Sequence, residues 1–397
     1  MLIAENQLTG FQTGFKIIRF VGDAVHDFDP ITNKFLVRDQ EKVQRAKRNY
    51  PFAIGFIVVT LFQVIVATYT NQITMADFLQ CVFVMATYLV VAYAQWSIIT
   101  KRYQMEQIFN HMLDFENSQN GSKWKPSGVT GSLVAKLVRL TIFPFPFAIL
   151  VYLGQILFLP CLPAHFGFFL LPQCSIKINS LQIFLAFPTI KLIYVVVVII
   201  IMELFSGFSA RVLFPGFIFD VTISYLWCYC ISNYIKLYSR ILNKISVHTK
   251  NFYGSVSTFR QIQIIMIEFN SYHQNYNSVV KIGYMVIGID IGLYALVRLY
   301  DSLLVPQIIT YMIAVIELFC VILFAYGLKA CVYVASKQLL KDIKGLNMLN
   351  GHKWFRRYIR SWPVLKVYLG SVNFIDEVTP LRILDFAISQ LVSLLLL

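Results

Sequence analysis

Charge is scarce in this sequence. Charged residues make up 14% of the 397-residue chain, against about 25% in soluble domains. Hydrophobic residues reach 57%, and a soluble globule of this length has too little interior to hide them, whereas lipid accepts them. Runs with almost no charge, such as 51–70 and 192–202, have the character of spanning helices and lack the alternation of a barrel strand. The composition therefore predicts an all-α membrane protein that crosses the bilayer several times.

Sequence signatures of catalysis and cofactor binding are also missing. The chain has no GxxxxGK[ST] loop, no GxGxxG after a strand and no HExxH, so we expect no enzyme and no cofactor. None of the six histidines pairs with cysteine at zinc spacing, and loop or interface positions are expected for them: His26, His111, His165, His248, His273 and His352. Nothing resembles a nucleic-acid-binding module, and the net charge of +14 is concentrated between apolar runs.

Cysteines are few and give no disulfide framework. Five of the seven fall in apolar runs, where a small buried hydrophobe is expected: Cys81, Cys228, Cys230, Cys320 and Cys331. The other two, Cys161 and Cys174, share one loop that we expect outside the cell. A disulfide between them is one interpretation, because disulfides persist in oxidising compartments. Two free thiols are the alternative, and both remain open.

Basic residues define the expected orientation. Lys and Arg gather in four regions, at 1–50, 101–139, 236–260 and 329–366. Basic residues are nearly absent from the loops between these regions, at 71–77, 160–181 and 299–306. Because cytoplasmic loops carry the excess of Lys and Arg, all four basic regions are expected inside. The N terminus is then cytoplasmic and the C terminus extracellular.

This alternation requires an odd number of crossings, which we take as seven transmembrane helices. The apolar region 182–235 is long enough for two spans, but the charges make it count once, as one long helix or two segments with a single net crossing. The expected spans lie near 51–70, 78–99, 138–160, 182–235, 279–298, 307–330 and 383–397.

Five ionisable residues interrupt the expected spans: Glu203, Arg211, Asp220, Asp290 and Glu317. Each costs about 2.5–3.5 kcal/mol at a helix centre on insertion scales. A polar cavity or ion pathway is one interpretation, and pairing between helices or placement near an interface is the other. The functional interpretation is favoured for Glu317, since apolar residues surround it in sequence.

Aromatic residues in the outer halves of spans are candidates for a ligand pocket. Packing in the core or in an interfacial belt is the commoner role for any one of them. The candidates are Phe83, Tyr152, Phe205, Tyr294 and Tyr311.

The last apolar run, 379–394, is interrupted by Ser389, Gln390 and Ser393. A helix would place Phe386, Gln390 and Ser393 or Leu394 on one face, at i, i+4 and i+7 or i+8. An amide beside apolar groups suits a pore with a hydrophobic constriction. A packed helix whose polar groups bond to neighbouring helices is the open alternative.

Two groups of residues carry a family resemblance. The first is Phe355-Arg356-Arg357, Ser361, Leu365-Lys366-Val367, Gly370 and Phe374, followed by Pro380-Leu381 and Phe386-Ala387-Ile388-Ser389-Gln390. These residues resemble the final two helical segments of the arthropod seven-transmembrane chemoreceptors, the gustatory and odorant receptor superfamily. The second group is similar to the cytoplasmic end of that family's fourth helix, and it comprises Phe219-Asp220, Ile235-Lys236-Leu237 and Arg240-Ile241-Leu242.

The overall length of the chain and the divergence of its last helix favour the gustatory branch of this superfamily. Gustatory members often carry Thr-Tyr, four apolar residues, any residue and then Gln-Phe in that helix. Here Gln390 matches, whereas Ile383-Leu384 replace Thr-Tyr and Leu391 replaces Phe. The motif is therefore met in part.

The resemblance implies a ligand-gated, non-selective cation channel in the plasma membrane of sensory neurons. It implies a homotetramer, or a heterotetramer with related subunits, opened by a small-molecule tastant or odorant bound in the outer half of the bundle. The last helix would line the pore, making Gln390, Leu391 and Leu394 filter and gate candidates. Cytoplasmic extensions would form an anchor between subunits from 236–278 and 332–375.

The expected organisation has three parts. Residues 1–50 form a cytoplasmic segment, and 51–335 form a six-helix bundle that includes the extensions at 236–278. Residues 336–397 form the anchor segment and the last helix.

Two other functions remain open. A seven-helix G-protein-coupled receptor has its N terminus outside and usually carries an Asn-Pro pair in helix seven, which this chain lacks. A secondary transporter usually contains inverted repeats. No repeat is detected here, and only the break near 207–215 in the apolar region favours that class.

Overall fold

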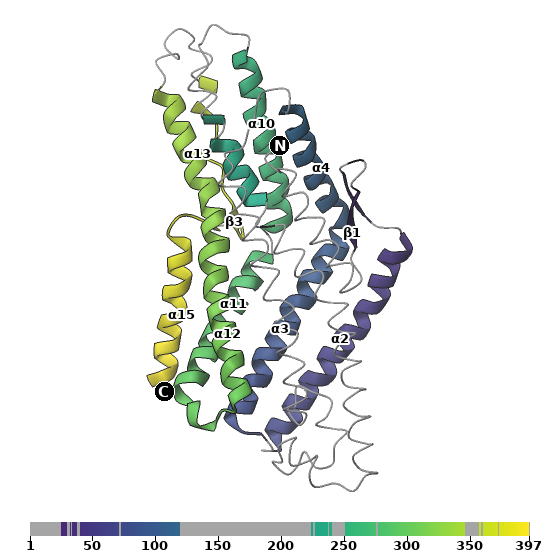
Figure 1. The fold of residues 1–397 in the computed structure, drawn as a ribbon, viewed down its shortest axis with the longest axis vertical. Helices are drawn as coiled ribbons and strands as arrows, with labels where there is room; N and C mark the ends of the chain where they lie inside the picture. The colour runs from purple at the N-terminus through teal and green to yellow at the C-terminus, as the bar shows by residue number, and fades with distance from the viewer. Residues whose placement is uncertain are drawn as a thin grey trace.

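The protein is an elongated bundle of long helices (Figure 1). The structure is a computed structural model. It describes residues 25–29, 32, 34–37, 40–70, 73–119, 224, 227–236, 238–239, 251–274, 277–345, 357–358, 360–371 and 373–396. Five of its helices are long and apolar enough to cross a membrane. The predicted all-α membrane fold is therefore confirmed in the described part of the chain.

The spanning helices agree with five of the seven expected spans. They are α2 (Gln40–Tyr69), α3 (Met75–Thr100), α11 (Asn277–Arg298), α12 (Val305–Val321) and α15 (Thr379–Leu396). Helix α12 runs on through a π-helical turn, η3 (Ile322–Tyr326), into α13 (Gly327–Gly345). A short 3-10 turn, η2 (Tyr300–Ser302), precedes α12. The span expected near 138–160 and most of 182–235 lie outside the described residues.

Helix boundaries differ from the expected spans because apolar runs mark only the part of a helix that lies in lipid. Helix α2 begins at Gln40, eleven residues before the run at 51–70, and carries Pro51 inside it. Residues expected to be polar loop form α4 (Arg102–Gln119), directly after α3. The N-terminal segment contains a hairpin of β1 (His26–Asp29) and β2 (Lys34–Val37). The sequence did not predict it, because each strand is too short to show a recognisable alternation of polar and apolar residues.

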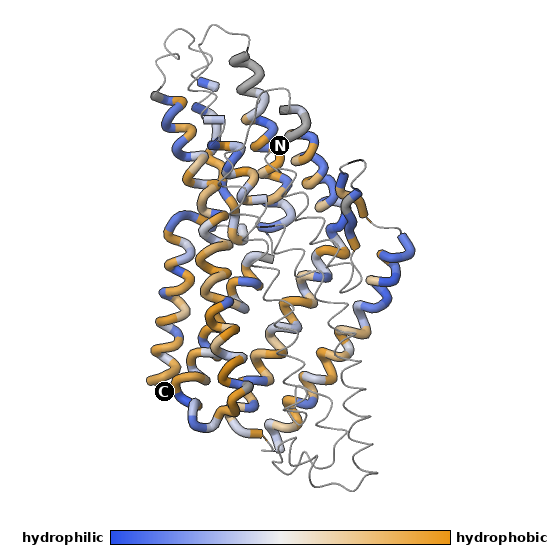
Figure 2. Tube along the Cα trace, viewed as in Figure 1, coloured by the Kyte–Doolittle hydropathy of each residue, from blue (hydrophilic) through white to orange (hydrophobic). Residues whose placement is uncertain are grey.

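The upper part of the molecule in Figure 1 is built from α4, α10 (Asn251–His273) and the far end of α13. Figure 2 shows that hydrophobic residues predominate along the lower helices and that polar and apolar residues are mixed above them. Two short strands, β3 (Tyr368–Leu369) and β4 (Asn373–Phe374), pair beside this upper part. Gly370, between them, has φ 66°, a conformation that glycine adopts without a steric penalty.

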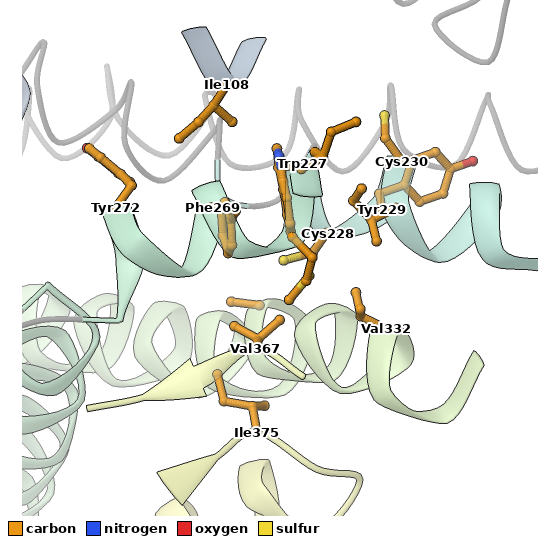
Figure 3. Close-up of a cluster of buried hydrophobic side chains, with 14 of the residues drawn as sticks. Ile108, Trp227, Cys228, Tyr229, Cys230, Phe269, Tyr272, Val332, Val367 and Ile375 are labelled. Atoms are coloured by element: carbon orange, nitrogen blue, oxygen red, sulfur yellow. The ribbon is translucent and has the colours of Figure 1, made fainter. Parts of the chain in front are cut away.

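A buried aromatic core holds the upper part together. The Trp227 and Phe269 rings stack with centroids 3.6 Å apart and planes 9° from parallel. Figure 3 shows this pair, with Val367 and Ile375 packed nearby. All four side chains are buried in one hydrophobic cluster. Helix α10 is thereby fastened to the segment that leads into α15.

Helices α11 and α12 pack closely through glycine. A Cβ added to Gly292 would lie 2.5 Å from Val315 Cγ2, and one added to Gly288 would lie 2.7 Å from Leu318 Cδ1. Small residues four apart let membrane helices approach in this way. The position of α12 against α11 thus depends on the absence of two side chains.

Burial of single residues differs in part from what the sequence indicated. His26 and His273 are buried, which the sequence did not indicate, and each ring stacks on a phenylalanine, Phe35 and Phe269 respectively. Cys320 is exposed on α12, where an apolar run gave no indication of which side faces lipid. Cys81, Cys228 and Cys230 are buried as expected and Cys331 is partly buried, while Cys161 and Cys174 lie outside the described residues.

Candidate ligand site and pore helix

The outer end of the bundle is identified by charge. Lys42, Arg45, Lys47 and Arg48 lie in the first turns of α2, at the upper end of that helix in Figure 1. Because basic residues remain on the cytoplasmic side, the lower ends of the helices in Figure 1 are outer. The start of α3, the end of α11 and the start of α12 meet there.

A hydrogen-bonded corner fixes the outer ends of α3 and α12. Thr74 caps α3: its hydroxyl accepts from the Asp77 N–H at 3.2 Å and donates to Asp77 Oδ2 at 2.6 Å. Gln307 donates from Nε2 to Asp77 Oδ1 at 3.3 Å and accepts from the Leu304 N–H at 2.9 Å. One carboxylate therefore ties the cap of α3 to the first turn of α12.

Two of the predicted pocket aromatics meet just inside this corner. The Phe83 and Tyr311 rings lie edge to face with centroids 6.1 Å apart, within a buried cluster that also holds Ala76, Ala295 and Leu303. The Tyr311 hydroxyl has no hydrogen-bond partner among the described residues. A buried hydroxyl without a partner costs about 1–3 kcal/mol, so this position suits a ligand that carries a hydrogen-bonding group.

The other predicted residues lie apart from this pair. Tyr294 on α11 and Glu317 on α12 are half-buried and are not members of the cluster around Phe83 and Tyr311. Asp290 is buried on α11. Tyr152, Phe205, Glu203, Arg211 and Asp220 fall outside the described residues.

Buried glutamines were missed by sequence reasoning. Gln63 on α2 and Gln80 on α3 are each 0% exposed, and neither amide has a hydrogen-bond partner within the part of the chain that the structure describes. The sequence did contain an indication of them, since each glutamine lies inside an apolar run. Burying an amide there without a hydrogen bond costs free energy.

Gln80 shares one side of α3 with two residues that reach α11 and α12. Positions 80, 83 and 87 stand at i, i+3 and i+7. Phe83 contacts Tyr311, and the Thr87 hydroxyl lies 3.0 Å from the Tyr284 hydroxyl of α11. This side of α3 therefore presents an amide that no described residue bonds, among hydroxyl and aromatic groups, which is suited to a small molecule with both apolar and hydrogen-bonding parts.

The pore and gate candidates all lie on α15, which contacts α11 and η3. Ile383 and Ala387 form its buried face. Phe386 is 55% exposed and Leu394 41% exposed, and Gln390 is exposed between them. Leu391 is half-buried and lies nearer the buried side, so it does not share the face of the other three.

The start of α15 is capped by Asp376. Its Oδ1 accepts the Thr379 N–H at 2.9 Å and the Val378 N–H at 3.2 Å, while the Asp376 N–H donates to the Thr379 hydroxyl at 2.9 Å. The Thr379 hydroxyl also donates to Asp376 Oδ1 at 2.6 Å. This bond, followed by the two from backbone N–H groups, holds the pKa of the Asp376 carboxyl below its ordinary value. The helix is thus firmly started at the cytoplasmic end, where it leaves the β3–β4 hairpin.

The whole chain matches solved structures of known receptors. The insect olfactory receptor OR5 from Machilis hrabei superposes with a TM-score of 0.57 at 12% sequence identity, over 98% of each chain. The same receptor in complex with eugenol gives a TM-score of 0.57 at 13% identity and the same coverage. The protein has the fold of an insect olfactory receptor. No protein-family model matches the sequence, and a search of curated proteins found no significant match.

The olfactory receptor fold confirms the fold that the resemblance in the last two segments predicted. It spans nearly the full length of both chains, so the likeness includes the last helix and the preceding cytoplasmic part. At 12% identity the roles of single residues do not transfer. The gustatory branch, the three-part division of the chain and the pore and ligand residues stay predictions.

Proposed function

We propose that this protein is a chemoreceptor of the insect gustatory and odorant superfamily that acts as a ligand-gated cation channel. The observation that carries the proposal is the olfactory receptor fold over the whole chain, with a last helix that exposes an amide beside apolar side chains. Phe386, Gln390 and Leu394 are exposed in a single subunit, and assembly of several subunits around a shared axis would cover this face of α15. There Gln390 contacts permeating ions and Leu394 narrows the pore, while Leu391, at the edge of this face, remains a further gate candidate.

The assembly is proposed to be a homotetramer, or a heterotetramer with related subunits, in the plasma membrane of sensory neurons. Helix α15 lies at the edge of the subunit opposite α2 in Figure 1, which suits a pore formed between subunits. The partial match of the last helix to the gustatory motif, through Gln390, favours a tastant over an odorant as the natural ligand.

The ligand is proposed to bind in the outer half of the bundle, near Phe83 and Tyr311, with Tyr294, Glu317, Tyr152 and Phe205 as further candidates. The buried Gln80 amide and Tyr311 hydroxyl support a ligand that carries hydrogen-bonding groups on an apolar frame. Eugenol, which is bound in one structure of the Machilis hrabei receptor, has that character and is a natural first probe.

The decisive test of this function is current in an excised membrane patch. The chain would be expressed alone and with a related subunit, and a panel of tastants and eugenol applied without nucleotides. We expect a cation current that begins on ligand application and persists without soluble cytoplasmic factors. A ligand response seen in whole cells but lost on excision would instead indicate a G-protein-coupled receptor, and substrate uptake without channel openings would indicate a transporter.

A further inference from the structure

Four helices bring cationic groups together inside the protein, at the level where the bundle meets its cytoplasmic part. Lys101 directly follows α3, His273 ends α10, Lys281 lies in the first turns of α11 and Lys329 in the first turn of α13. His273 is 0% exposed, Lys329 4% and Lys281 5%. In Figure 2 this level separates the apolar lower helices from the mixed upper part.

The described contacts of Lys101 and Lys329 are with neutral groups. Lys329 Nζ lies 2.8 Å from His273 Nε2 and 4.7 Å from the centre of the Tyr326 ring. Lys101 Nζ donates to the Tyr272 carbonyl at 3.1 Å and lies 5.4 Å from the centre of the Tyr272 ring. Within the described part of the chain, neither Lys101 nor Lys329 has a carboxylate partner.

The hydrogen bond between Lys329 and His273 leaves a second donor unused. An ammonium group only donates, so His273 Nε2 accepts and the ring proton is on Nδ1. Burial, followed by the ammonium groups of Lys329 and Lys101, holds the pKa of His273 well below its ordinary value, which keeps the ring neutral. No described residue accepts a hydrogen bond from Nδ1. Among the described residues, the Nδ1 donor of this buried ring therefore lacks an acceptor, and the ammonium groups of Lys101 and Lys329 lack a carboxylate partner.

Burying ammonium groups without an anion is costly, and the fold adds a further attraction for negative charge. The 22-residue helix α11 begins at Asn277, next to the cluster, and Ser278 donates to the His273 carbonyl at 3.1 Å. A helix N-terminus carries partial positive charge and free N–H groups. An anion with several acceptor oxygens would match these ammonium and N–H donors together.

We propose that Lys101, His273 and Lys329 form a binding site for a phosphate group at the cytoplasmic boundary of the membrane. The start of α11 contributes positive potential. The same chemistry is offered by the phosphorylated headgroup of a cytoplasmic-leaflet lipid and by a free phosphate compound. Because the groups belong to α3, α10 and α13, an occupant joins the transmembrane bundle to the cytoplasmic helices that lead to α15.

The test uses the full-length protein purified in detergent and measures its thermal unfolding midpoint. The two probes are inorganic phosphate and short-chain dioctanoyl phosphatidylinositol bisphosphate, with sodium chloride at matched ionic strength as reference. We expect one or both probes to raise the midpoint saturably. A rise with the lipid alone assigns the site to a headgroup, and a rise with phosphate assigns it to free phosphate.

Matched variants separate this site from general electrostatic binding. Lys329→Met and, independently, Lys101→Met remove one cationic contact each and are expected to weaken the midpoint response about tenfold in probe concentration. Lys341→Met removes an exposed charge from the same helix, α13, and is expected to leave the response unchanged. The second variant keeps the test informative if Lys329→Met fails to fold.

Two results would overturn the proposal. One is a wild-type midpoint that moves no more with either probe than with sodium chloride. The other is a response that Lys341→Met weakens as much as the two site variants do, since that would place binding on the exposed basic surface.

Discussion

At the residue scale, burial decides what a polar side chain does, and the sequence carries little information about burial. His26 lies in a polar N-terminal segment and Gln80 in the apolar run at 78–99, and the side chains of both are buried. His26 belongs to a hairpin tied to α4 by a reciprocal pair of bonds between the Asn110 amide and the Phe35 backbone, each 2.9 Å. Which polar residues become buried depends on contacts between distant segments, and for that reason sequence reasoning missed both.

His26 makes the attachment of the N-terminal hairpin sensitive to acid. Its Nε2 donates to the Arg102 carbonyl at 2.9 Å, and burial lowers the pKa of the ring to about 4. The detached hairpin has an ordinary histidine pKa near 6.5 and binds a proton first as the pH falls. The attached state therefore loses stability from about pH 6.5 down to about pH 4, by about 3 kcal/mol in total.

Hydrogen exchange over 25–37, corrected for intrinsic rates, measures this effect. We expect clearly weaker protection at pH 5 than at pH 7.5. The variant His26→Gln has an amide in place of the ring and does not titrate, so its protection is expected to change little between the two pH values. Equal pH dependence in both proteins would show that another group is responsible.

Gln80 tests the ligand site at the level of one amide. Replacing it with leucine is expected to leave thermal stability unchanged or slightly higher, because the amide has no described partner and an apolar group suits the buried position. The ligand concentration for half-maximal current is expected to rise about tenfold, the worth of one buried hydrogen bond.

The control for this prediction is Gln95→Leu. Gln95 is buried on the same helix near its cytoplasmic end, and its Nε2 also has no partner among the described residues. Potency should be normal in that variant. If the two replacements shift potency equally, Gln80 has no special role in binding.

At the element scale, the apolar runs located the described membrane helices well, and local chemistry set their real ends. The runs at 279–298 and 307–330 correspond to α11 and α12. The extension of α12 through η3 into α13 was not predictable from hydropathy, because polar residues such as Lys337 and Lys341 continue the helix outside lipid. The predicted face of Phe386, Gln390 and Leu394 is exposed on α15, while Leu391 falls outside it because a one-residue step turns about 100°.

The contact between α11 and α12 predicts different outcomes for two identical substitutions. Gly292→Ala places a methyl group against Val315 and is expected to destabilise the protein by about 1–3 kcal/mol through overpacking. Gly283→Ala, on the same helix, adds its methyl where nothing lies within 4 Å and is expected to be neutral or slightly stabilising.

Thermal unfolding of the purified protein in detergent compares the two alanine variants. The account requires a lower midpoint for Gly292→Ala than for Gly283→Ala. Equal midpoints would mean that α11 and α12 separate without cost and that close glycine packing does not hold them.

At the scale of the whole molecule, the described part of the chain has an apolar lower half, a cytoplasmic upper half and a last helix that begins between them (Figure 2). Charge alternation predicted this orientation, and the olfactory receptor fold spans 98% of the chain. Composition alone did not separate a channel from other multi-pass proteins, since lipid imposes the same apolar pattern on all of them. The exposed face of α15 is the feature that favours a channel.

The central claim is that α15 lines a cation pore, and charge substitution at Gln390 tests it most directly. Single-channel currents would be recorded from Gln390→Glu and Gln390→Lys, with Ile388→Ala, an exposed position on another side of α15, as the control. We predict that the carboxylate raises cation conductance, that the ammonium lowers it, and that Ile388→Ala leaves it unchanged, because a fixed charge beside the permeation path acts on ions according to its sign. Wild-type conductance in both charged variants would contradict the account.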